Sequence, residues 1–268
     1  MTHLKRWLTG IVAVPILIYV IGPGPRWLFH IFLFLASIIS LHEFLGIAAP
    51  RLPALVKLLG FILSFLLFYF ISYGPFFMTL AIISLWVILP MSVYLFAYSS
   101  QRPHALEDIG KIALGLLYVC LPLSLFIFID RHPRGNMWIF FLLAVIFLSD
   151  TGAFYVGRSF GKHKLYPTVS PGKTWEGAVG GVLGSLLAAF LFSYFFSIYK
   201  INFVIICLAA SLSVCGQIGD LAESMLKRRY GVKDSGKILP GHGGLLDRID
   251  GLLFSIPVLY IFLTWSLP

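Results

Sequence analysis

Four aspartates lie in stretches of sequence that are otherwise apolar. Asp150 falls inside one apolar run, Asp220 lies near the end of another, and Asp247 and Asp250 stand at the start of the last. A charged aspartate at the centre of a membrane-spanning helix costs about 2.5 to 3.5 kcal/mol, and less toward the ends, so such residues usually have a partner. A salt bridge or a helix cap explains any one of them, whereas several at the same depth favour a cation site.

The side chains around these aspartates favour a hard cation and a phosphate. No matching His or Cys cluster accompanies the carboxylates, and Mg²⁺ is usually bound by one or two carboxylates together with substrate phosphate oxygens. After Asp220, the residues Glu223, Ser224, Lys227 and Arg228 recur at helical spacing. One helical face can therefore carry a metal ligand and, further along, groups that bind phosphate, although a charged interfacial helix would give the same pattern.

Two segments beside the aspartates, 158–174 and 223–250, are longer than a simple connection requires and are rich in Lys, Arg and Gly. In the first, Ser170 and Lys173 precede an expected helix N-terminus, which attracts anions. In the second, glycines let backbone N–H groups approach an anion closely, although such a turn is more often only a turn, and no Walker A motif is present. The glycines that could approach an anion in the second segment are Gly241, Gly243 and Gly244.

The elements that must position these residues are membrane-spanning helices. Of the 268 residues, 59% are hydrophobic and only 12% are charged, whereas soluble domains are about 25% charged, so a lone soluble domain is excluded. Unbroken apolar runs without strand-like alternation predict an all-α, polytopic membrane protein with about nine transmembrane helices. The predicted spans are 8–22, 27–48, 54–73, 76–99, 111–129, 137–157, 175–198, 202–222 and 251–266.

The basic residues predict an orientation. With the N-terminus inside and nine spans, sixteen of the 20 Lys and Arg fall on the cytoplasmic side, and only Arg26, Arg131, Arg134 and Lys200 fall outside. This asymmetry favours an N-in, C-out topology. It also explains the net charge of +9 without a nucleic-acid partner. We expect residues 1–130 to be scaffold helices and residues 131–268 to be the catalytic region.

The sequence from Ser224 to Asp250 resembles the signature of phosphatidate cytidylyltransferases, the CDP-diacylglycerol synthases. The match spans twenty-seven residues and includes the run Pro-Gly-His-Gly-Gly-Leu-Leu-Asp-Arg-Ile-Asp that ends at Asp250. The upstream segments from Ser149 to Leu165 and from Ser170 to Gly177 also resemble that family.

The resemblance implies that CTP and phosphatidate react to give CDP-diacylglycerol and pyrophosphate. It implies a requirement for Mg²⁺ and allows a second, monovalent cation such as K⁺. Carried over by position, Asp220 and Asp247 are the expected metal ligands, with Asp150 and Asp250 nearby. The residues expected to contact phosphates are Lys227, Arg228, Lys237, His242, Arg248, Lys173 and Ser170.

The reaction suits these residues, because an anionic lipid phosphate needs charge neutralisation and alignment rather than a strong general base. We expect an integral protein of the inner, cytoplasmic cell membrane with its active site facing the cytoplasm. The alternatives are an ion-coupled transporter, a polyprenol kinase and an archaeal-type lipid cytidylyltransferase. Small residues at four-residue spacing from Gly177 to Ala189 indicate close helix packing and are compatible with a homodimer.

Overall fold

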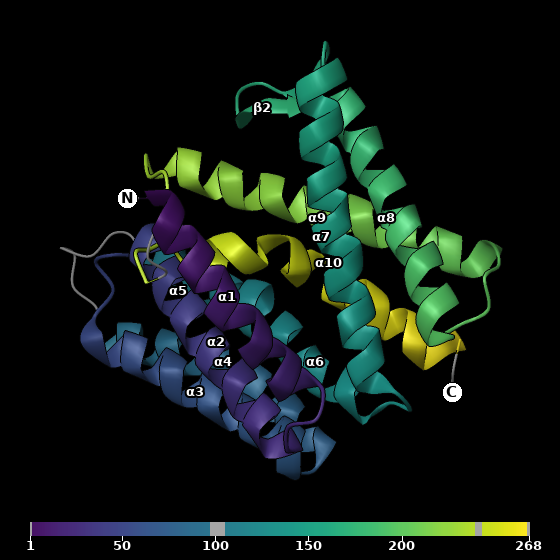
Figure 1. Ribbon diagram of the computed structural model, residues 1–268. Helices are drawn as coiled ribbons and strands as arrows, with labels where there is room; N and C mark the ends of the chain where they lie inside the picture. The colour runs from purple at the N-terminus through teal and green to yellow at the C-terminus, as the bar shows by residue number, and fades with distance from the viewer. Residues whose placement is uncertain (1, 97–104, 239–242, 267–268) are drawn as a thin grey trace. The chain divides into compact units, whose positions relative to one another are not determined.

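The structure, a computed structural model, describes residues 2–96, 105–238 and 243–266. It is an all-α polytopic membrane protein, to which the described residues add one two-stranded hairpin (Figure 1). The helices are α1 (Thr2–Ile21), α2 (Arg26–Ala48), α3 (Ala54–Tyr73), α4 (Phe76–Phe96), α5 (Ala105–Gly115), the π-helical η1 (Leu116–Cys120), α6 (Leu121–Arg131), α7 (Gly135–Phe160), α8 (Trp175–Phe196), α9 (Phe203–Arg229) and α10 (Leu246–Ser266), and the strands are β1 (Lys164–Tyr166) and β2 (Ser170–Thr174).

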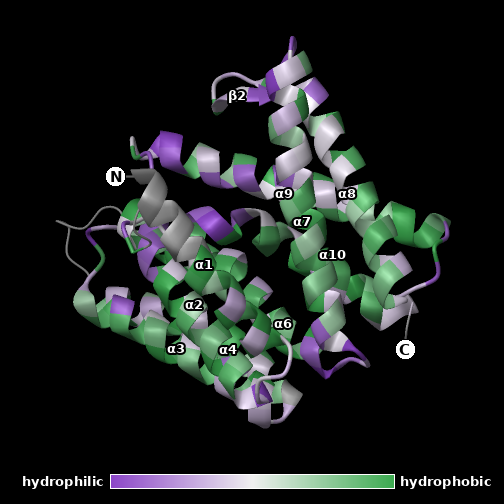
Figure 2. Ribbon diagram, in the orientation of Figure 1, coloured by the Kyte–Doolittle hydropathy of each residue, from purple (hydrophilic) through white to green (hydrophobic). Residues whose placement is uncertain are grey.

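Eight helical segments of the described chain are long and apolar enough to cross a membrane, with α5, η1 and α6 forming one of them. Hydrophobic residues fill these helices, whereas hydrophilic residues gather at the hairpin and along the C-terminal part of α9 (Figure 2). Within the described residues, each predicted span falls on helical structure. Residues 97–99 of the span 76–99 lie outside the described residues, and the described apolar part of α1 is only Ile11–Ile21. The number nine and the N-in, C-out orientation therefore stay predictions.

The chain divides into two compact units. The first contains Met1–Ile127 and Asp234–Leu246, and the second contains Phe128–Lys233 and Asp247–Pro268. The segment Asp234–Leu246, which the sequence analysis placed in the catalytic region, packs with the first unit instead.

A buried carboxylate explains how the segment Asp234–Leu246 is held in the first unit. Glu43 of α2 is 4% exposed, and its carboxylate accepts hydrogen bonds from the backbone N–H of Leu245 (3.1 Å) and of Leu246 (2.8 Å). The hydroxyl of Ser235 donates to the same carboxylate over 3.3 Å. These contacts give Glu43 a structural role.

In the second unit, α7 and α8 run side by side at close range (Figure 1). A Cβ at Gly177 would lie 2.9 Å from the Ala153 carbonyl oxygen and 3.2 Å from the Cα of Gly157. The buried face of α8 consists of Gly177, Gly180, Gly181, Ser185, Ala188, Ala189 and Ser193. Small residues allow this approach of two helix backbones. Because this face is covered within the chain, it gives no support to the expected homodimer.

In the segment 158–174, the first three residues end α7 and the part from Lys164 to Thr174 forms a β-hairpin, which the sequence analysis did not predict. The antiparallel strands pair Lys164 with Thr174 and Tyr166 with Ser170. Thr174 then caps α8, because its side-chain oxygen accepts a hydrogen bond from the Gly177 N–H over 3.1 Å. The hairpin thus delivers β2 directly to the N-terminus of α8.

Candidate active site

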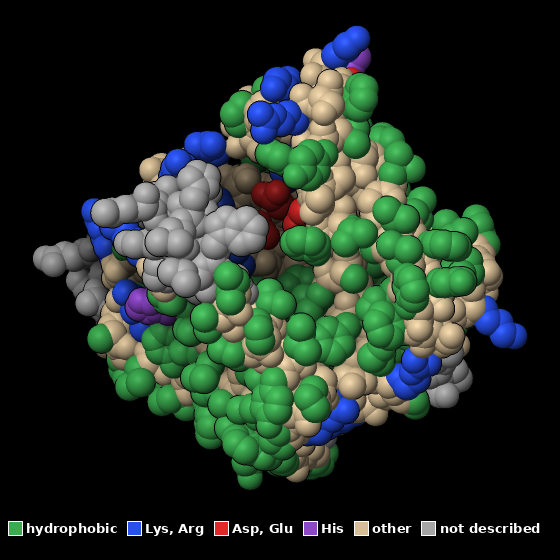
Figure 3. Space-filling view, viewed as in Figure 1, with side chains coloured by type: hydrophobic (Ala, Val, Ile, Leu, Met, Phe, Trp, Pro, Cys, Tyr) green, Lys and Arg blue, Asp and Glu red, His purple; other side chains and the backbone are tan. Residues whose placement is uncertain are grey.

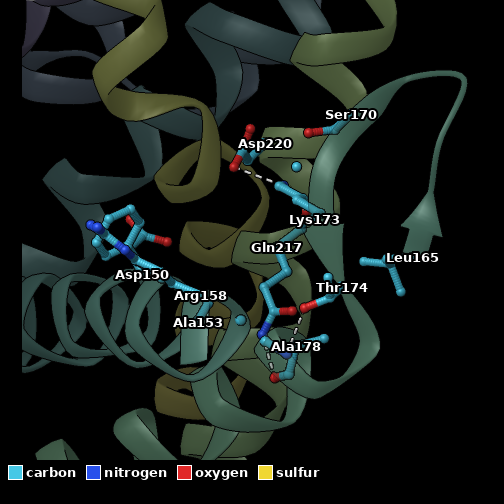
Figure 4. Close-up of a pocket in the computed structure, with 14 residues that line it drawn as sticks. Asp150, Ala153, Arg158, Leu165, Ser170, Lys173, Thr174, Ala178, Gln217 and Asp220 are labelled. Atoms are coloured by element: carbon cyan, nitrogen blue, oxygen red, sulfur yellow. Dashed lines mark hydrogen bonds and ion pairs between the residues drawn. The ribbon is translucent and has the colours of Figure 1, made fainter. Parts of the chain in front are cut away.

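A cavity of about 480 Å³ lies within the second unit, among α7, the hairpin, α8 and α9. Its polar lining includes Asp150, Lys173 and Asp220, and its apolar lining includes Phe154 and Leu165. Ligand sites are commonly concave, apolar cavities of about 300 to 1,000 Å³ with a few placed polar groups. Figure 4 shows the polar residues converging on this cavity from β2 and α9.

An ion pair joins β2 to α9 at the cavity. The Lys173 Nζ lies 2.7 Å from Asp220 Oδ2 and 3.5 Å from the backbone oxygen of Gln217. The Ser224 hydroxyl donates to Asp220 Oδ1 over 3.4 Å. The side chains of Lys173 and Asp220 remain 24% and 44% exposed, so a ligand in the cavity can reach both charges.

Two more carboxylates lie near Asp220. Asp150 of α7 and Asp250 of α10 are both close enough for their charges to act on that of Asp220. Like charges at short range repel one another, and a shared cation relieves that repulsion. Asp150 and Asp250 thus lie within electrostatic range of Asp220.

Asp247, the fourth predicted ligand, belongs to a buried cluster beside them. The Lys227 Nζ lies 2.6 Å from Glu223 Oε2 and 2.8 Å from Asp247 Oδ1. The side chains are almost fully enclosed, with Lys227 16%, Glu223 0% and Asp247 7% exposed. Asp250 is also close enough to Glu223 for their charges to act on each other, which connects this cluster to the aspartates around Asp220.

Contacts from α9 and α8 hold the hairpin in place. The exposed Arg228 donates from Nε to the Val169 carbonyl over 3.2 Å. The His163 Nδ1 lies 2.6 Å from Glu176 Oε1 at the start of α8. These contacts give Arg228 a structural partner in addition to the phosphate contact expected from the sequence, and they fix the strand that carries Ser170 and Lys173.

Three predicted substrate-binding residues belong to the first unit. Lys237 is exposed there, Gly243 has a φ of +83°, and Gly244 packs where a Cβ would lie 2.6 Å from Glu43 Oε2. The backbone of these glycines is therefore suited to conformations and close approaches that other residues resist. His242 lies outside the described residues, and Arg248 is exposed in the first turn of α10.

The donor set fits a cation that is shared with a substrate. Within the described chain, no group of three or more His, Cys, Asp or Glu side chains is arranged to hold a metal ion. Mg²⁺ does not require such a cage, because it is usually bound by one or two carboxylates, several waters and substrate phosphates. Asp220, which lines the cavity and is exposed to it, meets that requirement.

Sequence reasoning missed three residues that line the cavity, namely Arg158, Thr174 and Gln217. Gln217 had a usable signal, because it is an amide well inside a mostly apolar predicted span and stands three residues before Asp220 on the same helical face. The sequence analysis gave Arg158 and Thr174 no individual role within the segment 158–174. Their part in the cavity depends on the hairpin, which the sequence did not predict.

Comparisons with known proteins agree with the site. A family profile described as "Cytidylyltransferase family" matches residues 4–266. A protein named phosphatidate cytidylyltransferase from Bacillus subtilis (strain 168) is 36% identical over 262 residues, which are 97% of this chain and 97% of that protein. Proteins of the same name from Staphylococcus epidermidis and Staphylococcus aureus (strain COL) are each 34% identical, covering 96% and 97% of this chain and 98% and 99% of theirs. This chain therefore belongs to the cytidylyltransferase family.

Proposed function

We propose that this protein is a phosphatidate cytidylyltransferase, which makes CDP-diacylglycerol and pyrophosphate from CTP and phosphatidate. The observation that carries the proposal is the open Lys173–Asp220 pair in a cavity among membrane-spanning helices. A water-soluble triphosphate and a lipid phosphate can meet at such a site. The names of the relatives from Bacillus and Staphylococcus agree with this reaction.

The reaction needs charge neutralisation more than proton transfer. A phosphatidate oxygen, already anionic near neutral pH, attacks the α-phosphorus of CTP, and the bond to the β-phosphate bridging oxygen breaks as pyrophosphate leaves. The two reactants repel each other, so positioned cations lower the barrier. Lys173 is the best-placed cation, since its ammonium group lies at the cavity and can exchange Asp220 for a phosphate oxygen.

The carboxylates would hold the metal that this chemistry requires. Asp220 is the first ligand in this proposal, with Asp150 and Asp250 close to it. Asp247 joins them only if Lys227, which lies 2.8 Å from it, turns toward a phosphate. When bound, Mg²⁺ neutralises phosphate charge and supports the departing pyrophosphate. A monovalent cation such as K⁺ is a further part of the proposal.

The remaining groups position the substrates. Ser170 and Lys173 enter the cavity from the hairpin, while Ser224 supports Asp220 from the next turn of α9. Lys227, Arg228, Lys237, His242, Gly243, Gly244 and Arg248 complete the proposed set of phosphate-binding residues. The proposed location is the inner, cytoplasmic cell membrane, with the cavity open to the cytoplasm.

Purified protein in detergent, given CTP, phosphatidate and Mg²⁺, tests this function. We expect pyrophosphate release that requires both substrates, together with a liponucleotide product. Release of CDP with a phosphorylated lipid would instead identify a CTP-dependent lipid kinase, and turnover with only a polyprenyl or archaeal-type lipid acceptor would identify a different lipid enzyme. A folded preparation that binds no nucleotide and releases no pyrophosphate would contradict the proposal.

A further inference from the structure

Gln217 places a polar side chain inside the cavity, within an apolar part of α9. It is half-buried, lines the cavity, and lies three residues before Asp220, so the two side chains share one face of the helix. In Figure 4 the Gln217 side chain leads away from the Lys173–Asp220 pair toward Ala178. The proposed reaction has so far given this residue no role.

The amide of Gln217 is held in one orientation. Its Nε2 donates to the Ala178 carbonyl oxygen over 3.2 Å and to the Ser213 hydroxyl oxygen over 3.2 Å. A backbone carbonyl can only accept a hydrogen bond, so the nitrogen and not the oxygen must face Ala178. Both N–H groups of the amide are then used, and Oε1 is left as an acceptor.

The surroundings of the amide are built around this orientation. Ser213 is fully buried, and its hydroxyl lies 2.7 Å from that of Ser149 on α7. At Gly181 of α8, a Cβ would lie only 2.7 Å from the Gln217 Nε2. The absence of a side chain at Gly181 therefore provides the space that the Gln217 amide occupies. Residues of α7, α8 and α9 all contribute to holding the amide in this orientation. Buried polar networks that are fully satisfied are rigid and specific.

A fixed acceptor at this position distinguishes two pyrimidine bases. Cytosine carries an amino group at C4 that donates hydrogen bonds, whereas uracil has a carbonyl oxygen there that accepts them. We propose that Gln217 Oε1 accepts a hydrogen bond from the 4-amino group of CTP and so selects CTP over UTP. This inference rests on the proposed cytidylyltransferase function and identifies Gln217 as the residue that contacts the base of the bound nucleotide.

Rejection of UTP follows from the same geometry. To donate to the uracil O4, the amide would have to turn over, and its oxygen would then face the Ala178 carbonyl at the 3.2 Å now spanned by a hydrogen bond. Two acceptors at that distance repel each other, and the Ser213 hydroxyl would lose its donor. A site that leaves polar groups unpaired with the wrong substrate rejects it strongly.

The test compares nucleotides in one enzyme preparation. The ratio of kcat/KM for CTP to that for UTP is measured for the wild type, Gln217→Met and Gln217→Glu, with phosphatidate as acceptor. A 2-pyrimidinone nucleoside triphosphate, which carries no group at C4, is the third substrate. Because the ratio is taken within one preparation, the fraction of folded enzyme cancels.

We expect Gln217→Met to lower the CTP/UTP ratio by on the order of ten- to a hundredfold and to lose the preference for CTP over the 2-pyrimidinone analogue. Gln217→Glu keeps an acceptor toward the base, since its protonated oxygen can donate to Ala178, and should retain a ratio within a few-fold of the wild type. Ser255→Ala is the matched control, because it removes buried hydrogen bonds to Leu212 and Gly251 outside the cavity. It should leave the ratio unchanged.

Two results would overturn the assignment. If Gln217→Met slows CTP and UTP equally, the residue only packs the helices. If Gln217→Glu loses the selectivity for CTP over UTP as fully as Gln217→Met does, that selectivity does not depend on a hydrogen-bond acceptor at position 217. Should Gln217→Met lose turnover, thermal stabilisation of the detergent-solubilised protein by CTP and UTP gives the same comparison. Failure of the wild type to turn over CTP would instead refute the proposed function itself.

Discussion

Lys173 and Lys227 each form ion pairs with acidic side chains of α9 or α10. Lys173 pairs with Asp220 at the cavity, where both side chains are partly exposed. Lys227 pairs with Glu223 and Asp247, where all three are almost fully enclosed. Enclosed charges depend on one another far more than exposed ones do. We infer that the first pair opens to bind substrate and that the second holds α9 and α10 in register until Lys227 turns toward a phosphate.

Replacing Asp220 with Asn should remove activity without removing the fold. The amide keeps the shape of the side chain but not the negative charge proposed to hold Mg²⁺, so we expect kcat/KM to fall by on the order of a hundredfold or more. The fall should persist across a Mg²⁺ titration. Asp108→Asn on α5 is the control, since Asp108 lies outside the cavity and pairs with Lys111 over 3.5 Å. Wild-type rates for Asp220→Asn at every Mg²⁺ concentration would refute the metal assignment.

Replacing Lys173 and replacing Lys227 should lower the free energy of unfolding by different amounts. Lys227→Met leaves the enclosed Glu223 and Asp247 without their shared cation, so we expect the free energy of unfolding to fall by about 3 to 5 kcal/mol. Lys173→Met breaks a partly exposed pair, for which the loss should be about 1 kcal/mol or less, while activity still falls steeply. Thermal unfolding in detergent, measured beside turnover, checks both. Equal destabilisation by the two changes would contradict this division of roles.

At the scale of residues, the sequence predicted which side chains belong to the candidate site better than it predicted which of them form ion pairs. Asp150, Ser170, Lys173 and Asp220 were named from their types and positions, and all four line one cavity. The ion pair between Lys173 and Asp220 was not predictable, because it depends on a hairpin whose strands are too short to show alternation. Gln217 was missed because a lone amide forms no motif until its partners are known.

At the scale of elements, Glu43 fixes the start of α10. Its carboxylate accepts from the N–H groups of Leu245 and Leu246, which begin the helix, and an anion at a helix N-terminus is favoured by the unpaired N–H groups and the helix dipole. Asp247 follows Leu246 directly in the same helix.

Glu43→Ala should loosen the segment Asp234–Leu246 and lower activity. The change leaves the N–H groups of Leu245 and Leu246 unpaired, at a cost of about 1 to 3 kcal/mol for each buried group. We expect faster tryptic cleavage after the exposed Lys237 and a lower kcat. Glu43→Gln keeps one acceptor oxygen and should fall between wild type and Glu43→Ala in both measurements. Unchanged cleavage for Glu43→Ala would show that the carboxylate does not hold the segment.

At the scale of the whole molecule, apolar composition predicted the fold class and the positions of the helices. Hydrophobic side chains cover much of the visible face, as a surface in contact with lipid should show (Figure 3). The place of Asp234–Leu246 in the first unit was not predictable, because it involves a contact between Glu43 and a residue about 200 positions later. Hydropathy reports which residues lie in the membrane and not which helices pack together.

The proposed orientation can be tested with single cysteines. In a chain whose Cys120, Cys207 and Cys215 are replaced by alanine, Lys164→Cys in β1 should react with a membrane-impermeant thiol reagent only after cells are opened. Lys200→Cys, between α8 and α9, should react in intact cells. The reason is the concentration of Lys and Arg on the cytoplasmic side of membrane proteins. The reverse labelling pattern would invert the topology.

Attack at the α-phosphorus of CTP is tested most directly by following the α- and γ-phosphates of CTP separately. Purified protein is given phosphatidate, Mg²⁺ and CTP labelled at either the α- or the γ-phosphate, with Asp220→Asn as the inactive control. Attack at the α-phosphorus predicts that the α label enters the lipid phase and that the γ label leaves as pyrophosphate. Transfer of the γ label to lipid, or entry of neither label by a folded wild-type enzyme, would contradict the account.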